Sequence, residues 1–334
     1  MYVSYEKLLN KFETILLGRG VDPVMAHAAA ENFAQTSLDG VYSHGVNRFP
    51  RVISYIDKGV VDGRAKPECV ASAGGFERWD GHMGLGNANA KLAMDRACAL
   101  AHAHGIGVVA IGNTNHWMRG GAYGWQAADN GCVGICWTNT MPNTPAWGGI
   151  EPKIGNNPFI ISIPQSGGRH IVIDCAMSQF AFGKIEMARM KGEKLPVPGG
   201  FDSDGNPTTD PAEIEKTGRA LTIGYWKGSG LSIALDLVAA VLSGGNTVTD
   251  IGRKYTEEVG LSQVMIAIDP NHMQGAALTD EIIERVVSDI KTATPTREGG
   301  KILYPGELEL ATRAENREKG IPVLEEVWNQ IKSL

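Results

Sequence analysis

Five short apolar runs, rich in β-branched residues, constrain the fold of this chain more than any other feature. They are IGVVAIGN (106–113), VGICWTN (133–139), NPFIISIP (157–164), RHIVIDCA (169–176) and QVMIAIDP (263–270). Runs of this kind are typical of strands that are buried on both faces. Segments with helical patterns separate several of them, over 120–130, 178–191, 229–243 and 279–292. The alternation predicts an α/β domain whose sheet is covered by helices on both faces.

The two ends of the chain show sequence patterns that are mostly typical of helices. Apolar residues of the segment 4–18 share one helical stripe. A second helix is expected to begin at Asp22 and Pro23, a cap followed by a proline in the first turn, and to stop before Gly40. The last thirty residues are helical again. We therefore expect a helical domain built from 1–80 and 300–334, beside an α/β domain over 81–299.

Two segments inside the α/β domain carry more specific expectations. A helix is predicted over 87–105, capped by Asn87 and ended by Gly105. The stretch 192–225 is rich in Gly, Pro and Asp and is predicted to be a long loop, a kind of segment that often carries function.

Composition narrows the class of protein. The formal net charge is −6, and there is no long basic run, which argues against a nucleic-acid or anionic-membrane surface. Of five cysteines none forms a CxxC pair, and several lie in apolar contexts, as expected for thiols buried in a reducing compartment. The longest apolar run, 231–242, is interrupted by Asp236, so no membrane span is predicted. We expect a cytoplasmic protein.

The segment YSHGVNRFPR (42–51) is the first candidate for chemistry. The side chains of His44 and Arg48 are expected to project from one tight bend. They lie either on one face of a helix or just before a helix that has Asn47 as its N-cap and Pro50 in its first turn. Arginine can grip a carboxylate with two parallel hydrogen bonds, and histidine can deliver a proton near pH 7. A solvated polar turn is the alternative.

Other candidates follow strands. His116, in NTNHWMRGG, comes at the carboxyl end of a strand, where α/β proteins bind ligands, although a capping loop would also account for it. Asp174 can cap a helix, contact a cofactor ribose or orient a histidine. Trp226 and Lys227 precede a helix and could cover a planar ring and hold a phosphate, although a Gly-rich turn would also account for the segment. No GxGxxG follows a strand, so an ordinary Rossmann site is not indicated.

Taken in order, the blocks SHGVNRFPR, NTNHWMRGG, GNNPFIISIP, IDCAMSQFAFGKIE, GYWKGSG and PGELE resemble the malate/L-lactate dehydrogenase type 2 family of NAD(P)-dependent oxidoreductases. The resemblance covers nearly the whole chain and is strongest to the subgroup that acts on 2,3-diketo-L-gulonate. It implies a homodimer and a non-Rossmann, mixed-sheet nucleotide-binding domain beside a helical substrate and dimer domain.

The resemblance also implies roles for particular residues. His44 occupies the position of the family's proton donor, and Arg48 that of the arginine that binds the substrate carboxylate. His116 occupies the position of a second active-site histidine. The residues that fall on the family's cofactor contacts are His170, Ile171, Val172, Ile173, Asp174, Cys175, Ala176, Trp226, Lys227, Gly306, Glu307 and Leu308.

The expected activity is reduction of the ketone of a 2-oxo sugar acid by NADH, with His44 as the proton donor and without a metal. NADH is expected rather than NADPH because the sequence shows no arginine cluster that would bind the 2′-phosphate of NADPH. Malate, lactate, ureidoglycolate or a cyclic imino acid remain possible substrates. Two further hypotheses stay open, a non-catalytic sugar-acid binding protein and a metal hydrolase built from His44, His82 and His116.

Overall fold

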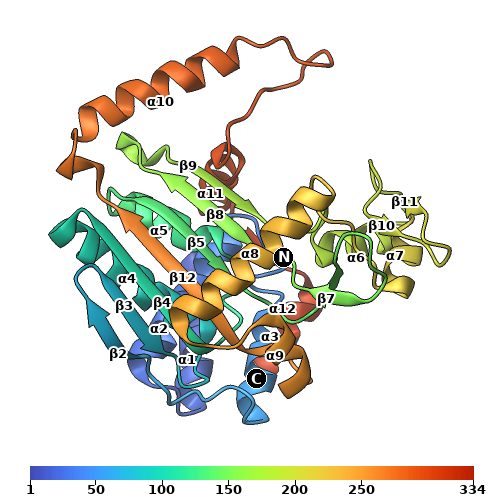
Figure 1. The fold of residues 1–334 in the computed structure, drawn as a ribbon, viewed down its shortest axis with the longest axis horizontal. Coiled ribbons are helices and arrows are strands. Elements are labelled where there is room, and N and C mark those ends of the chain that lie inside the picture. The colour runs from blue at the N-terminus through green and yellow to red at the C-terminus, as the bar shows by residue number, and fades with distance from the viewer.

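A seven-stranded sheet forms the centre of the computed structural model, which describes residues 1–334 (Figure 1). Its strands, in spatial order, are β2 (Glu68–Ala73), β3 (Phe76–Asp80), β4 (Ile106–Asn115), β12 (Val259–Ile268), β5 (Val133–Thr138), β8 (Phe159–Ile163) and β9 (Ile171–Cys175). Only β3 and β4 pair in parallel, and the other neighbours are antiparallel. The predicted mixed sheet is therefore confirmed.

Helices cover both faces of this sheet, and the central strand β12 shows why. Its neighbouring residues Val264 and Met265 project to opposite faces and enter different cores. Met265 packs among the small side chains of α4 (Gly86–His104) and α5 (Gly121–Asp129). Val264 packs with Leu235 and Ala239 of α8 (Trp226–Ser243) on the other face.

A helical layer built from both ends of the chain contains the largest core. It consists of β1 (Tyr2–Val3), α1 (Tyr5–Gly18), α2 (Pro23–Leu38), α3 (Phe49–Asp57), α11 (Glu307–Lys319), β13 (Ile321–Pro322) and α12 (Glu325–Ser333). The rings of Phe12 and Phe49 stack with centroids 4.2 Å apart, and Phe33 meets both edge-on. Strand β1 pairs with β13, which fastens the two ends of the chain together.

The expected boundary of the helical domain at residue 80 is wrong. Strands β2 and β3 form a hairpin at the edge of the sheet, so 68–80 belong to the α/β part. All six residues of β2 are exposed, and a strand without a buried face lacks the apolar alternation that would reveal it. Asn87 also does not cap α4, which begins at Gly86, and its side chain instead donates to the carbonyl of Ala29.

The prediction of a long loop over 192–225 is also wrong. The segment folds against α6 (Phe182–Met190) as β10 (Gly200–Phe201), β11 (Pro207–Thr208) and α7 (Pro211–Thr217). Ile185, Leu195 and Ile214 make a separate small core there, which turn residues obscured in the sequence. The remaining α-helices and β-strands are β6 (Thr144–Pro145), β7 (Pro152–Ile154), α9 (Val248–Lys254) and α10 (Ala276–Lys291), with α10 standing away from the body in Figure 1.

Candidate active site

The bend that carries the first candidate residues is built by close approach of two backbones. A Cβ added to Gly45 would lie 2.3 Å from Oγ of Ser37, so no larger residue fits there. The same hydroxyl accepts a hydrogen bond of 2.8 Å from the Val46 amide. Helix α3 then begins at Phe49 with Arg48, not Asn47, as its flanking residue and with Pro50 in its first turn, where a proline is tolerated.

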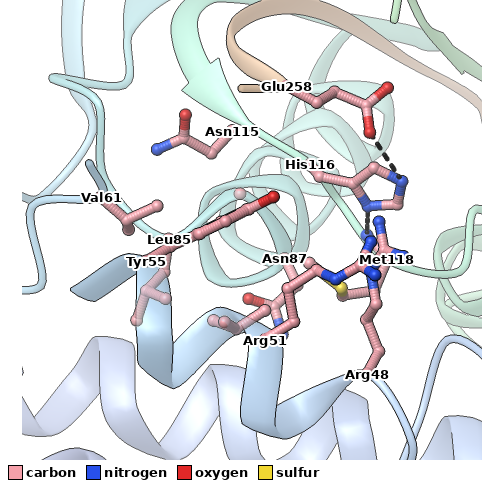
Figure 2. A pocket seen from close by; sticks show the side chains of 12 residues that line it. Arg48, Arg51, Tyr55, Val61, Leu85, Asn87, Asn115, His116, Met118 and Glu258 are labelled. Atoms are coloured by element: carbon pink, nitrogen blue, oxygen red, sulfur yellow. Dashed lines mark hydrogen bonds and ion pairs between the residues drawn. The ribbon is translucent and has the colours of Figure 1, made fainter. Parts of the chain in front are cut away.

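The structure brings His44, Arg48 and His116 together. The centroids of the His44 and His116 imidazole rings lie 6.0 Å apart in a stacked arrangement with an interplanar angle of 26°, although the two residues are 72 positions apart in the chain. Arg48 and His116 line one cavity (Figure 2), whose other residues are Arg51, Val52, Tyr55, Val61, Leu85, Gly86, Asn87, Asn115, Met118 and Glu258. The histidine after β4 and the arginine before α3 thus share one site between the helical layer and the sheet.

His116 is fixed by hydrogen bonding from its own loop. Its Nδ1 accepts the Met118 amide proton at 2.9 Å, which leaves the ring proton of the neutral form on Nε2. That nitrogen faces Oε2 of Glu258 at 3.7 Å (Figure 2). Met118 adopts φ +65°, a left-handed conformation that is strained for any residue other than glycine. Sequence reasoning missed Glu258, because an acidic residue before a strand gives no specific signal.

The site carries an excess of positive charge. Burial, and then the neighbouring His116 and Arg48, lower the pKa of His44 to about 3. Burial, and then Arg48 and Arg51, lower the pKa of His116 to about 3 as well. Neither guanidinium makes an ion pair in Figure 2, whereas burial raises the pKa of the one nearby carboxyl, Glu258. A bound anion would relieve this excess.

The free space in the cavity is small. About 20 Å³ remains between the side chains, which is room for a single water molecule. Arg51, which lines this cavity, is exposed, and its side chain makes no hydrogen bond or ion pair.

A buried ionic network supports the loop that follows His116. Asp39, at the end of α2, accepts hydrogen bonds from Arg119 at 2.5 Å and from Nε of Arg313 at 2.7 Å. Arg119 also lies 4.0 Å from Asp174 of β9 and 3.8 Å from Glu309 of α11. One guanidinium thus links α2, the His116 loop, β9 and α11, and sequence reasoning had assigned none of these partners.

The segments expected to hold a cofactor converge along β9. The Val172 amide donates to the carbonyl of Pro305 at 2.9 Å, and the Ile223 amide donates to that of Met177 at 2.9 Å. The turn before α11 and the turn before α8 therefore lie at the two ends of 170–177. Gly306 has φ +98°, and a Cβ there would lie 3.1 Å from the carbonyl of His170, so the close approach favours glycine.

Side chains in these segments differ in what they could contact. His170 is buried, with Nδ1 accepting from the Gln165 amide and Nε2 facing Asp129, so only its backbone could meet a ligand. Glu307 pairs with Lys291. Leu308 is 62% exposed.

Trp226 and Lys227 lie in the first turn of α8, not before it as predicted. Trp226 is 59% exposed, and Nζ of Lys227 lies 5.7 Å from its ring. Tyr225, the residue before them, has φ +59° and ψ −116°, a strained conformation that fixes the direction of this turn. An exposed planar ring beside an unpaired ammonium group suits a nucleotide.

His82 does not join the other two histidines. It pairs with Glu68 and Asp80 on the edge hairpin. The structure contains no group of three His, Cys, Asp or Glu side chains that could hold a metal ion. The cavity lined by Arg48, Arg51 and His116 combines two cations and an imidazole, a composition suited to binding an organic anion.

Comparison with known proteins shows which family and which solved structures this chain is similar to. The family model described as malate/L-lactate dehydrogenase matches residues 3–332. The 2,3-diketo-L-gulonate reductase of Citrobacter koseri is 47% identical over 334 residues, 100% of both chains. Sulfolactate dehydrogenase from Methanocaldococcus jannaschii is 31% identical with a TM-score of 0.91, covering 100% of this chain and 96% of its own. Malate dehydrogenase from Entamoeba histolytica is 25% identical with a TM-score of 0.94 and the same coverages.

Proposed function

The chain belongs to the malate/L-lactate dehydrogenase family, and from that premise we propose that it reduces the ketone of a 2-oxo sugar acid of the 2,3-diketo-L-gulonate type with NADH. The observation that carries the proposal is a cavity lined by Arg48 and His116, with unpaired positive charge, and the imidazole of His44 6.0 Å from that of His116. The identity of 47% over the full length to a reductase of that name supports the choice of substrate.

Arg48 holds the substrate carboxylate in this proposal. A guanidinium binds a carboxylate through two parallel bonds and so fixes the direction of the adjacent ketone. His116, with its proton on Nε2, donates a hydrogen bond to the ketone oxygen or to a neighbouring hydroxyl. His44 delivers a proton to that oxygen as negative charge develops on it. Positioned acids of this kind contribute about 10²–10⁴-fold to a rate.

His44 takes up its proton from solvent when the substrate binds. In the free protein the imidazole is neutral at pH 7, because its pKa is about 3. Burial is the largest cause of this low pKa, followed by the charges of His116 and Arg48. A carboxylate bound at Arg48 offsets the charge contribution, and an oxyanion nearby raises the pKa further. Glu258 and Arg119 are the other charged groups that act on His44. The neutral imidazole of the free protein suits the reverse reaction, in which it accepts the proton of a hydroxy acid.

The cofactor is proposed to lie along β9, on a non-Rossmann domain, where it supplies the hydride when bound. The backbone of 170–176 and the turn at Gly306 would line its nicotinamide half. Trp226 would cover a ring, and Lys227 would pair with a phosphate. The absence of an arginine cluster beside these residues favours NADH over NADPH.

A homodimer is proposed through the outer faces of α8 and α10. Helix α8 is long and apolar enough to cross a membrane by composition alone, but a third of it is buried and it packs on the sheet. Besides Trp226, the exposed apolar residues on the two helices are Leu231, Ile233, Leu237, Val238, Val241, Leu278, Ile282, Val286 and Ile290. Contiguous exposed apolar residues are typical of protein interfaces, and a second copy of the chain would cover these two helix faces.

A panel of 2-oxo acids, each offered with NADH and with NADPH, tests the proposal. We expect NADH oxidation with 2,3-diketo-L-gulonate to exceed that with pyruvate, oxaloacetate or a cyclic imine. If one of those acids is turned over faster, that acid takes the place of 2,3-diketo-L-gulonate as the proposed substrate. Cofactor binding without turnover of any acid would support a binding protein instead of an enzyme.

A further inference from the structure

One face of α3 forms the polar side of the cavity. Arg48, Arg51 and Tyr55 follow one another at spacings of three and four, so they project from the same side of the helix. The opposite wall near Tyr55 is apolar and is formed by Val61 and Leu85 (Figure 2). From Arg48 to Tyr55 the helix advances about 10 Å.

The two ends of this row have different chemistry. At the His116 end, the Arg48 guanidinium has no carboxylate partner in Figure 2. At the far end, the Tyr55 hydroxyl donates to Oε2 of Glu257 at 2.9 Å. Burial, and then this bond, raise the pKa of Tyr55, so the phenol keeps its proton. The oxygens of Tyr55 and Glu257 retain lone pairs, which can accept hydrogen bonds from hydroxyl groups.

We infer that Tyr55 and Glu257 bind the hydroxylated end of the substrate and select polyhydroxy 2-oxo acids over unsubstituted ones. The inference rests on the proposed function, because the carboxylate held by Arg48 sets the direction of the substrate chain. A six-carbon chain extends roughly 6 Å from its carboxylate, given C–C bonds near 1.5 Å, which covers more than half of the helical rise of about 10 Å between Arg48 and Tyr55. A three-carbon acid ends well short of Tyr55.

Selectivity follows from the cost of leaving polar groups unpaired. An unsubstituted chain would cover the Tyr55 hydroxyl and the Glu257 carboxylate without returning the hydrogen bonds that water gave them. A hydroxylated chain returns those bonds. Each hydrogen bond to a charged group is typically worth a factor of about 10 or more in affinity.

The test compares two six-carbon acids that differ in their hydroxyl groups. The ratio of kcat/KM for 2-keto-L-gulonate to kcat/KM for 2-oxohexanoate is measured with NADH for the wild type, Tyr55→Phe and Glu257→Gln. We expect the wild type to favour the hydroxylated acid. Tyr55→Phe should reduce the ratio about tenfold, mainly through KM for the hydroxylated acid, and Glu257→Gln should reduce it less because an amide still accepts a hydrogen bond.

The outcomes separate this inference from the proposed function. If both acids are turned over and the ratio is the same in the wild type and both variants, the inference is overturned while the function stands. Equal losses for both acids would assign Tyr55 a structural role only and would overturn it as well. If the wild type reduces no 2-oxo acid at all, the proposed function fails first. Tyr2→Phe, at an exposed tyrosine of β1, is the matched control and should leave the ratio unchanged.

Discussion

Replacement of Asp39 by Asn tests the buried network that supports the site. The Asp39 side chain is 1% exposed and accepts hydrogen bonds from Gln35, Arg119 and Arg313. Arg119 is itself 3% exposed, and its other acidic neighbours lie at 3.8 and 4.0 Å. Removal of the Asp39 charge therefore leaves a buried guanidinium without its close counter-charge. Losing one partner of a buried pair typically costs about 3–5 kcal/mol.

Urea unfolding at pH 7 measures this cost. We expect Asp39→Asn to lower the free energy of unfolding by about 3 kcal/mol or more. The control is Glu315→Gln, which removes a pair with Lys319 that is about 60% exposed on both sides. Its expected cost is about 0.5 kcal/mol or less. If the two variants cost the same, the buried network does not stabilise the junction between the helical layer and the sheet.

Three further predictions follow from the site and the surface. Arg48→Lys should raise KM for the oxo acid by roughly tenfold or more in steady-state assays, because an ammonium group cannot replace the two-pronged grip, and an unchanged KM would exclude the clamp. The pKa of His116 is about 3 in the folded protein and near 6.5 in the unfolded chain, so as pH falls below 6.5 the unfolded state gains the proton first. From pH 7 to pH 5 the wild type should lose about 2 kcal/mol more stability than His116→Asn, and equal losses in urea unfolding would contradict the low pKa. Val241→Glu, at a residue that is 78% exposed on α8, should give a monomer by light scattering, whereas Val70→Glu on the edge strand should not.

The sequence predicted the elements whose pattern repeats along the chain. The strands over 106–113 and 263–270 overlap β4 and β12, since a short apolar run rich in β-branched residues is typical of a strand buried on both faces. The hairpin of β2 and β3 escaped prediction because its outer strand is exposed throughout. The α6–α7 unit escaped because its small core is spread among turn residues.

The site was predictable only as separate pieces. His44 and Arg48 lie close in the chain, so their spacing alone suggested a shared role. The approach of His116 to His44 depends on how the helical layer packs on the sheet, and no local pattern encodes it. Glu258 and Asp39 were missed for the same reason, since each acquires its partners from distant elements.

The measurement that tests the central claim most directly is kcat for His44→Ala with 2,3-diketo-L-gulonate, taken beside the dissociation constant for NADH. We predict that kcat falls by about 10²–10⁴-fold while NADH binding changes less than about twofold, because the imidazole serves proton transfer and not cofactor binding. A variant that turns over at the wild-type rate would show that this imidazole does not deliver the proton.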